Sequence, residues 1–82
     1  MNFKAIGQDV RIDKTAILKY PQNICIGDHV AIDPYVVIST SLELGKYIHI
    51  GPHCTIIGGQ KSKLIMEDFS GFSASCRIVC AS

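Results

Sequence analysis

Three histidines are the side chains of this 82-residue sequence best suited to acid–base chemistry: His29, His49 and His53. A neutral imidazole accepts a proton near neutral pH, so each of them could act as a general base. The same ring can also ligate a metal ion. Which role is open to each histidine depends on the element that carries it and on the direction of its side chain.

The four cysteines, Cys25, Cys54, Cys76 and Cys80, could in principle form disulfides or bind zinc. The first residues of the chain lack the apolar stretch of a secretory signal, which argues against disulfides. The cysteine spacings contain no C-x-x-C pair and fit no usual zinc pattern. We therefore expect four free thiols and no metal site.

A six-residue repeat of Ile and Leu runs through the middle of the chain and predicts its fold. The repeated positions are Ile26, Ile32, Ile38, Leu44, Ile50 and Ile56. A helix would instead repeat its apolar positions every 3.6 residues, and a plain strand every two. The residue after each repeated position is often Gly or acidic, which we expect to supply the unusual backbone angles of a tight turn. This pattern is typical of a hexapeptide parallel β-helix.

The repeat predicts an all-β solenoid of about four coils that forms one domain over residues 1–82. Because three hexads make one coil, equivalent residues of successive coils should stack. The expected ladders are Ile26, Leu44 and Met66; Ile32, Ile50 and Phe72; and Ile38, Ile56 and Ile78. Breaks in the repeat predict a bulge at residues 19–23, around Pro21, and an extruded loop at residues 57–65.

His49 is the histidine that the repeat places in a strand with its side chain pointing outward. Its expected neighbours in the adjacent coils are Ala31 and Gly71, which would leave the imidazole in a shallow groove. The extruded loop leaves the same coil and could wall that groove. His49 is therefore the candidate general base, the alternative being an ordinary exposed histidine.

His29 and His53 each follow a repeated position by three residues, so both should lie at turns as solvated side chains. Tyr35 and Ser75 are the expected neighbours of His53. The stacking of equivalent residues in successive coils also places Cys54 beneath Cys76. We expect both side chains to point inward, where they fill small spaces in the core.

The charge pattern excludes some classes of function. Eight basic and seven acidic residues give a formal net charge of +1, without the basic footprint of a nucleic-acid-binding protein. No apolar run approaches the ~20 residues that a membrane span needs. A cytoplasmic protein is the expectation.

The hexads resemble those of the bacterial hexapeptide-repeat acyltransferases, and three segments strengthen the likeness: residues 47–51, 57–59 and 66–73, which read YIHIG, IGG and MEDFSGFS. The resemblance points in particular to sugar O-acetyltransferases of the surface-polysaccharide and galactoside-acetyltransferase type. It covers nearly the whole chain.

The resemblance implies a left-handed parallel β-helix that assembles as a homotrimer, with active sites in grooves between subunits. It also implies acetyl-CoA as the acyl donor and a sugar or similar small molecule as the acceptor. A histidine would deprotonate the acceptor hydroxyl or amine, which then attacks the thioester carbonyl while a backbone N–H steadies the oxyanion. His49 is the residue carried over as that base.

Two other functions remain open at this point. Family members are usually about twice this length, so the chain could be an N-terminal fragment or a non-catalytic trimeric β-helix module. A γ-class carbonic anhydrase shares the fold and binds zinc through three histidines. Its close histidine pair is spaced by five residues, whereas His49 and His53 are spaced by four.

Overall fold

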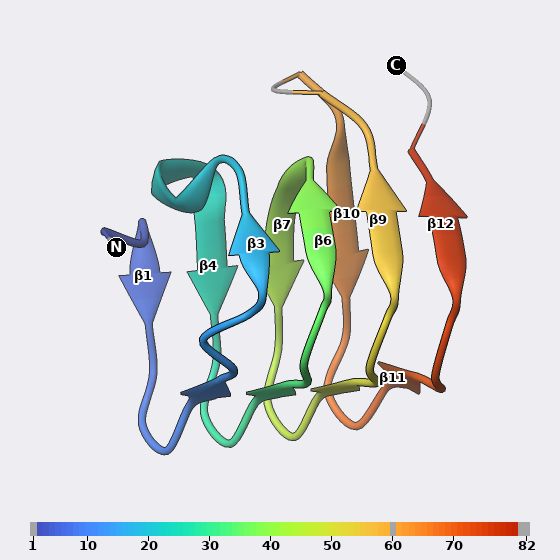
Figure 1. Ribbon diagram of the computed structural model, residues 1–82. Helices are drawn as coiled ribbons and strands as arrows, with labels where there is room; N and C mark the ends of the chain where they lie inside the picture. The colour runs from blue at the N-terminus through green and yellow to red at the C-terminus, as the bar shows by residue number, and fades with distance from the viewer. Residues whose placement is uncertain (1, 60, 81–82) are drawn as a thin grey trace.

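The computed structural model describes residues 2–59 and 61–80, which wind into a three-sided prism of stacked parallel strands (Figure 1). Each side of the prism is a four-stranded parallel sheet. The first face contains β1 (Ala5–Ile6), β4 (Ile24–Ile26), β7 (Ser41–Leu44) and β10 (Lys63–Met66). The second face contains β2 (Arg11–Ile12), β5 (Ala31–Ile32), β8 (His49–Ile50) and β11 (Gly71–Phe72). The third face contains β3 (Ile17–Leu18), β6 (Val37–Ser39), β9 (Thr55–Ile57) and β12 (Arg77–Val79).

This architecture confirms the predicted parallel β-helix of about four coils. The left-handed sense of coiling stays a prediction. The three predicted ladders are confirmed by the strand register, which pairs Ile26 with Leu44 and Leu44 with Met66, and likewise on the other two faces. Ile6, Ile12 and Leu18 extend the ladders into the first coil.

The ladders form the hydrophobic core of the prism. Ile38, Ile50 and Ile56 of the middle coils are completely buried. Phe72 and Ile78, in the last coil, are only partly buried and pack against that core from one end. Each inward side chain therefore depends on the coils above and below it for its burial, as in other solenoids.

The turns at the corners differ from the prediction. We expected the Gly or acidic residue after each repeated position to adopt unusual backbone angles, and this is wrong: no described glycine has a positive φ, and neither do Asp13, Asp33 and Glu67. The left-handed residue comes two positions later, as in His29 (φ 59°) and Tyr47 (φ 57°). Glycine is needed instead because coils approach closely, and a Cβ at Gly27 would collide with the carbonyl of Gly45.

The first corner, between the first and second faces, also ties the coils together through aspartate side chains. Asp28 accepts a hydrogen bond from the backbone N–H of Gln8 (2.8 Å), and Asp68 accepts one from that of Lys46 (2.7 Å). A Cβ at Gly45 would collide with that Asp68 carboxylate. The small residue and the carboxylate above it thus form one packing unit.

The third corner, between the third and first faces, carries both breaks of the repeat. The predicted bulge is the 3-10 helix η1 (Pro21–Asn23). The loop predicted over residues 57–65 is shorter, because Ile57 belongs to β9 and residues 63–65 belong to β10. Those residues pair in register with β7, so of the described residues in this segment only 58–59 and 61–62 lie outside strands, and Gln60 falls outside the described residues.

Ser62 anchors this loop to the prism. Its hydroxyl lies 3.0 Å from the buried hydroxyl of Thr40 and accepts a hydrogen bond from the N–H of Gly59 (2.6 Å). Ser62 and Thr40 are both buried. A Cβ at Gly58 would meet both hydroxyl groups, so this approach requires a glycine.

The described part of the chain contains one helix, η1, of three residues, and none that is long and apolar enough to cross a membrane.

Substitution of a ladder residue should prevent folding. Ile50 is completely buried between Ile32 of one adjacent coil and Phe72 of the other. The substitution Ile50→Asp would therefore place an unpaired charge in the core. We expect Ile50→Asp to abolish the cooperative thermal transition followed by circular dichroism. The control Lys61→Asp changes an exposed side chain and should melt within a few degrees of the unsubstituted chain. A normal transition for Ile50→Asp would contradict the core assignment.

Candidate active site

His49 opens β8 on the second face and points away from the core. The register pairs it with Ala31 on one side and Gly71 on the other, which confirms both predicted neighbours. Its side chain is 62% exposed. Neither neighbour has a side chain long enough to cover the imidazole, which therefore remains accessible to a ligand on this face.

Asp33 is the partner of His49 that the sequence analysis missed. The Asp33 Oδ2 atom lies 2.7 Å from His49 Nε2, and Asp33 is itself positioned by a hydrogen bond from its backbone N–H to the carbonyl of Ile50 (3.0 Å). Asp33 follows Ala31, the predicted neighbour of His49, by two residues. The pair is therefore a diagonal contact between adjacent coils, and a search of the diagonal positions around His49 could have found it.

The Asp33 carboxylate determines which nitrogen of His49 can accept a proton. An ionised carboxylate only accepts hydrogen bonds, so a neutral His49 donates its Nε2–H to Asp33. The lone pair then lies on Nδ1, which is the atom free to act as a base. A carboxylate in this position also stabilises the imidazolium that forms when the base takes a proton.

The other two histidines lie at turns, as predicted. His53 (φ 61°) stacks on Tyr35 with ring centroids 5.1 Å apart, and the pairing of Thr55 with Arg77 places Ser75 opposite His53 on the adjacent coil. These contacts confirm both predicted neighbours of His53.

His29 occupies the equivalent turn at the first corner. Its Nδ1 lies 2.9 Å from the carboxylate of Asp9, and its ring stacks on Tyr47 at 4.8 Å. Hydrogen bonding to His29 holds the pKa of the Asp9 carboxyl below its ordinary value. Phe69 extends the column of rings beyond Tyr47.

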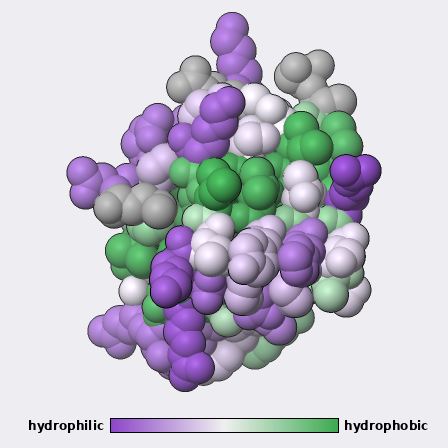
Figure 2. Space-filling model, viewed as in Figure 1, coloured by the Kyte–Doolittle hydropathy of each residue, from purple (hydrophilic) through white to green (hydrophobic). Residues whose placement is uncertain are grey.

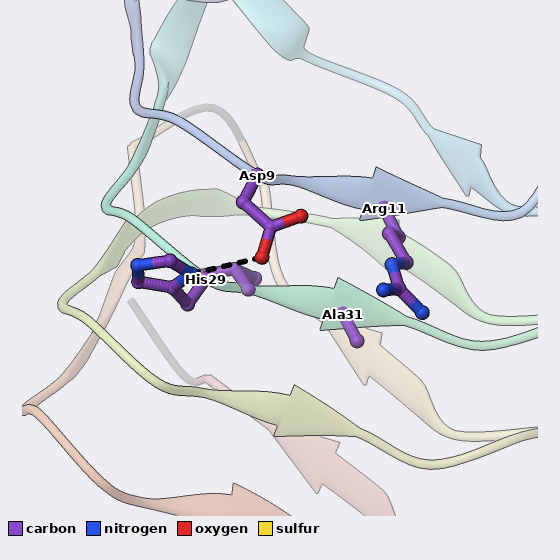
Figure 3. A pocket seen from close by; sticks show the side chains of 5 residues that line it. Asp9, Arg11, His29 and Ala31 are labelled. Atoms are coloured by element: carbon purple, nitrogen blue, oxygen red, sulfur yellow. Dashed lines mark hydrogen bonds and ion pairs between the residues drawn. The ribbon is translucent and has the colours of Figure 1, made fainter.

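A hollow on the second face leads away from the His49–Asp33 pair. An open pocket of about 500 Å³ is lined by Arg11, Ala31 and Asp33 together with Asp13 and neighbouring apolar residues. A smaller pocket adjoins this one and shares Arg11 and Ala31 with it. Figure 3 shows the Arg11 side chain reaching from β2 toward Ala31, and the Asp9–His29 pair at the opposite end of this smaller pocket. Ala31 therefore forms a low floor between Arg11 and His49.

The prediction that the extruded loop forms a wall of the groove around His49 is wrong for a single chain. The loop connects β9 to β10 at the third corner, whereas His49 lies on the second face across the prism. Figure 1 shows the loop at the top of the molecule and β11 of the second face at the bottom.

The described residues bring no three metal-ligating side chains together. His49 and His53 engage different partners, Asp33 and Tyr35 respectively, as expected for side chains that diverge.

Each of the four cysteines is a free thiol. Cys54 is buried next to Cys76, as the register of the adjoining Thr55 and Arg77 requires, and its thiol donates to the carbonyl of Ser73 (3.0 Å). Burial raises the pKa of the Cys54 thiol. Since the thiolate is the reactive form, Cys54 acts as a core filler rather than a nucleophile.

Comparison with known proteins relates the chain to acyltransferases. It is 35% identical over 81 residues to the dTDP-4-amino-4,6-dideoxy-D-glucose acyltransferase of Escherichia coli, a match that covers 95% of this chain and 41% of that enzyme. The chain thus spans about two fifths of the length of the curated relative. No family model matches it.

Solved structures give the same result. The chain resembles the N-acyltransferase AntD of Bacillus cereus, solved as a variant in complex with dTDP and coenzyme A, with a TM-score of 0.87, 32% identity, and coverage of 93% of this chain and 40% of AntD. AntD in complex with dTDP and 3-hydroxybutyryl-CoA gives a TM-score of 0.82 and 34% identity, covering 87% of this chain and 37% of AntD. The predicted resemblance to sugar acyltransferases is confirmed.

The hydrogen-bond geometry predicts opposite tautomers for two histidines. His49 should carry its proton on Nε2, facing Asp33, and His29 should carry it on Nδ1, facing Asp9. Long-range ¹H–¹⁵N NMR of the imidazole rings above pH 8 measures both. Asp33→Ala should convert His49 to a mixture of tautomers and leave His29 unchanged. A His49 that is already mixed in the unsubstituted chain would show that the pair does not form.

Proposed function

We propose that this chain forms part of an acyltransferase that transfers an acyl group from acyl-CoA to the amino group of a dTDP-linked amino sugar. The observation that carries the proposal is the His49–Asp33 pair on an open face of a β-helix that resembles N-acyltransferases holding CoA and dTDP. The acyltransferase with which the chain shares 35% identity is named for a 4-amino sugar, which favours an amine over the hydroxyl acceptor also considered from the sequence. The acetyl group predicted from the sequence is one member of the proposed donor class.

In the proposed mechanism, His49 Nδ1 removes a proton from the acceptor amine as the nitrogen attacks the thioester carbonyl. A C–N bond forms and the C–S bond breaks, and the proton passes to the departing CoA sulfur. Asp33 is a positioning residue that holds the Nε2–H of His49 and stabilises its imidazolium. A backbone N–H would steady the oxyanion.

We further propose that the chain acts as a homotrimer in the cytoplasm, where acyl-CoA is available. The third face supports a contact between copies through an apolar band, which consists of the exposed side chains of Ile17, Ile57 and Val79 and the half-buried Val37. Figure 2, viewed as in Figure 1, shows the apolar side chains of this face in green, with less hydrophobic side chains between them. An exposed apolar surface of this kind marks an interaction site. In such a trimer, the extruded loop of one subunit would supply a wall for the second face of another.

A non-catalytic trimeric β-helix is the second candidate, supported by the apolar side chains that the third face exposes. The γ-class carbonic anhydrase stays a less favoured alternative, and a zinc assay on the purified protein tests it. An acyl-transfer assay separates the proposed enzyme from both.

His49 should be essential to transfer. With 3-hydroxybutyryl-CoA or acetyl-CoA and a dTDP-linked 4-amino sugar as substrates, His49→Ala should lower kcat by roughly 10²–10⁴-fold, the usual contribution of a general base. Asp33→Asn should cause a smaller loss, because the base remains but is no longer oriented. The assay uses the protein that carries this chain, and also a chimera in which the chain replaces the matching part of the Escherichia coli enzyme.

His53→Ala is the matched control, since His53 stacks on Tyr35 at a turn and does not contact the His49–Asp33 pair. It should leave kcat within about threefold, with thermal stability measured for each variant. Full activity in His49→Ala would refute the assignment of the base. Equal losses for the two variants would also contradict it, because the structure gives them different surroundings.

The trimer has its own test. Analytical ultracentrifugation should give a mass three times the 8.9 kDa of one chain. Ile17→Lys combined with Val37→Lys should shift the protein to monomers, because both residues lie in the apolar band and neither is a fully buried core residue. Gln8→Lys, an exposed side chain at the first corner away from the band, serves as the control. A trimer that survives the double substitution would exclude the third face as the contact.

A further inference from the structure

Charge is unevenly distributed among the three corners of the prism. The first corner carries Asp9, Asp28, Glu67 and Asp68, and the second carries Asp13 and Asp33. The third corner carries no acidic residue, and the remaining carboxylate of the chain, Glu43, lies within β7 on the first face. Anionic groups are therefore repelled least at the third corner.

Lysines gather where the carboxylates are missing. An open pocket of about 260 Å³ at the third corner is lined by Lys4, Asn23, Ser41, Lys61, Ser62 and Lys63. Three lysines thus line one small hollow, and its other lining residues are an asparagine and two serines. Such a set offers hydrogen-bond donors and positive charge together.

The positive charge of this pocket is only partly neutralised within the chain. Lys63 Nζ lies 2.5 Å from Glu43 Oε2, and this contact raises the pKa of Lys63 and lowers that of Glu43. Lys4 and Lys61 form no ion pair with any other described residue. Two of the three lysines are therefore available to an anionic ligand.

The base of the pocket is held in place by the fold. Lys63 begins β10, which pairs with β7 along four residues, and the Ser62 side chain is fixed against the buried Thr40 hydroxyl. The backbone N–H of Ser41 donates to the carbonyl of Ser62 (3.2 Å), which joins the two strands across the hollow. The lysine side chains thus project from a positioned frame.

We infer that this pocket binds a phosphate group of one of the substrates. Ammonium groups are strong donors to phosphate oxygens, and the donors and net charge of the pocket match a tetrahedral oxyanion. The inference rests on the proposed function for its ligand, because acyl-CoA and a dTDP-sugar both carry phosphates. It adds a binding site on the third corner, away from His49, which fits a ligand shared between neighbouring subunits.

The direct test is the binding of inorganic pyrophosphate to the full chain. Isothermal titration calorimetry and ¹H–¹⁵N NMR of the backbone amides measure this binding. Pyrophosphate should shift the amide signals of Ser62 and Lys63 more than those of Asp33 and His49. The double substitution Lys4→Gln and Lys61→Gln should weaken binding by about tenfold or more while preserving the Lys63–Glu43 pair. The control Lys46→Gln removes one exposed lysine at the first corner and should leave binding unchanged.

Paired ligands identify the source of the phosphate. If the pocket takes the nucleotide diphosphate, dTDP should bind more tightly than thymidine, and the double substitution should remove that difference. If the pocket takes a CoA phosphate, CoA should bind more tightly than pantetheine, and the double substitution should remove that difference in affinity. Either result supports the inference.

The inference is overturned if pyrophosphate binds equally to the double variant and the unsubstituted chain, or if Lys46→Gln weakens binding as much as the double variant does. These outcomes leave the proposed function untouched, because the His49 assay measures it separately. Conversely, phosphate binding at this pocket in a protein without transferase activity would retain the site and reject the enzyme.

Discussion

The structure depends on one constraint, which is that each coil must place its inward residues directly over those of the coil below. Backbone hydrogen bonds between parallel strands impose this register, as in the bond from Gly27 N–H to the carbonyl of Leu44 (2.9 Å). A shift by one residue would turn every apolar side chain outward. The six-residue repeat is the sequence that satisfies this register on three faces at once, and the buried ladders of the middle coils follow from it.

The same register explains the corners. Because coils stack at the strand spacing of ~4.8 Å, little room remains between one turn and the next. Glycine at Gly27 and Gly45 leaves space for the backbone or the carboxylate above it. The left-handed positions take larger residues, whose side chains then stack upon one another, as His29 does on Tyr47 and Tyr35 on His53. Stacked rings thus line the first and second corners of the solenoid.

Outward positions are free of this constraint, and there the three sides of the prism diverge in chemistry. The second face carries small residues around the His49–Asp33 pair, the third face exposes Ile17, Ile57 and Val79, and the third corner is rich in lysine. A repetitive core therefore presents three different surfaces. If the proposed trimer forms, the apolar surface joins subunits and brings the other two near each other.

The sequence by itself determined the parallel β-helix, the three ladders, and the positions of His49 and His53 between their neighbours, because each follows from a strict period and a fixed coil length. Only the tertiary structure decided the contacts that the period does not encode. The Asp33–His49 hydrogen bond depends on side-chain direction across a diagonal. The shorter loop depends on how far β10 pairs with β7, and its distance from His49 depends on which corner it leaves. The lysine pocket unites Lys4 with Lys61 and Lys63, residues from separate coils, because stacking brings distant segments to one corner.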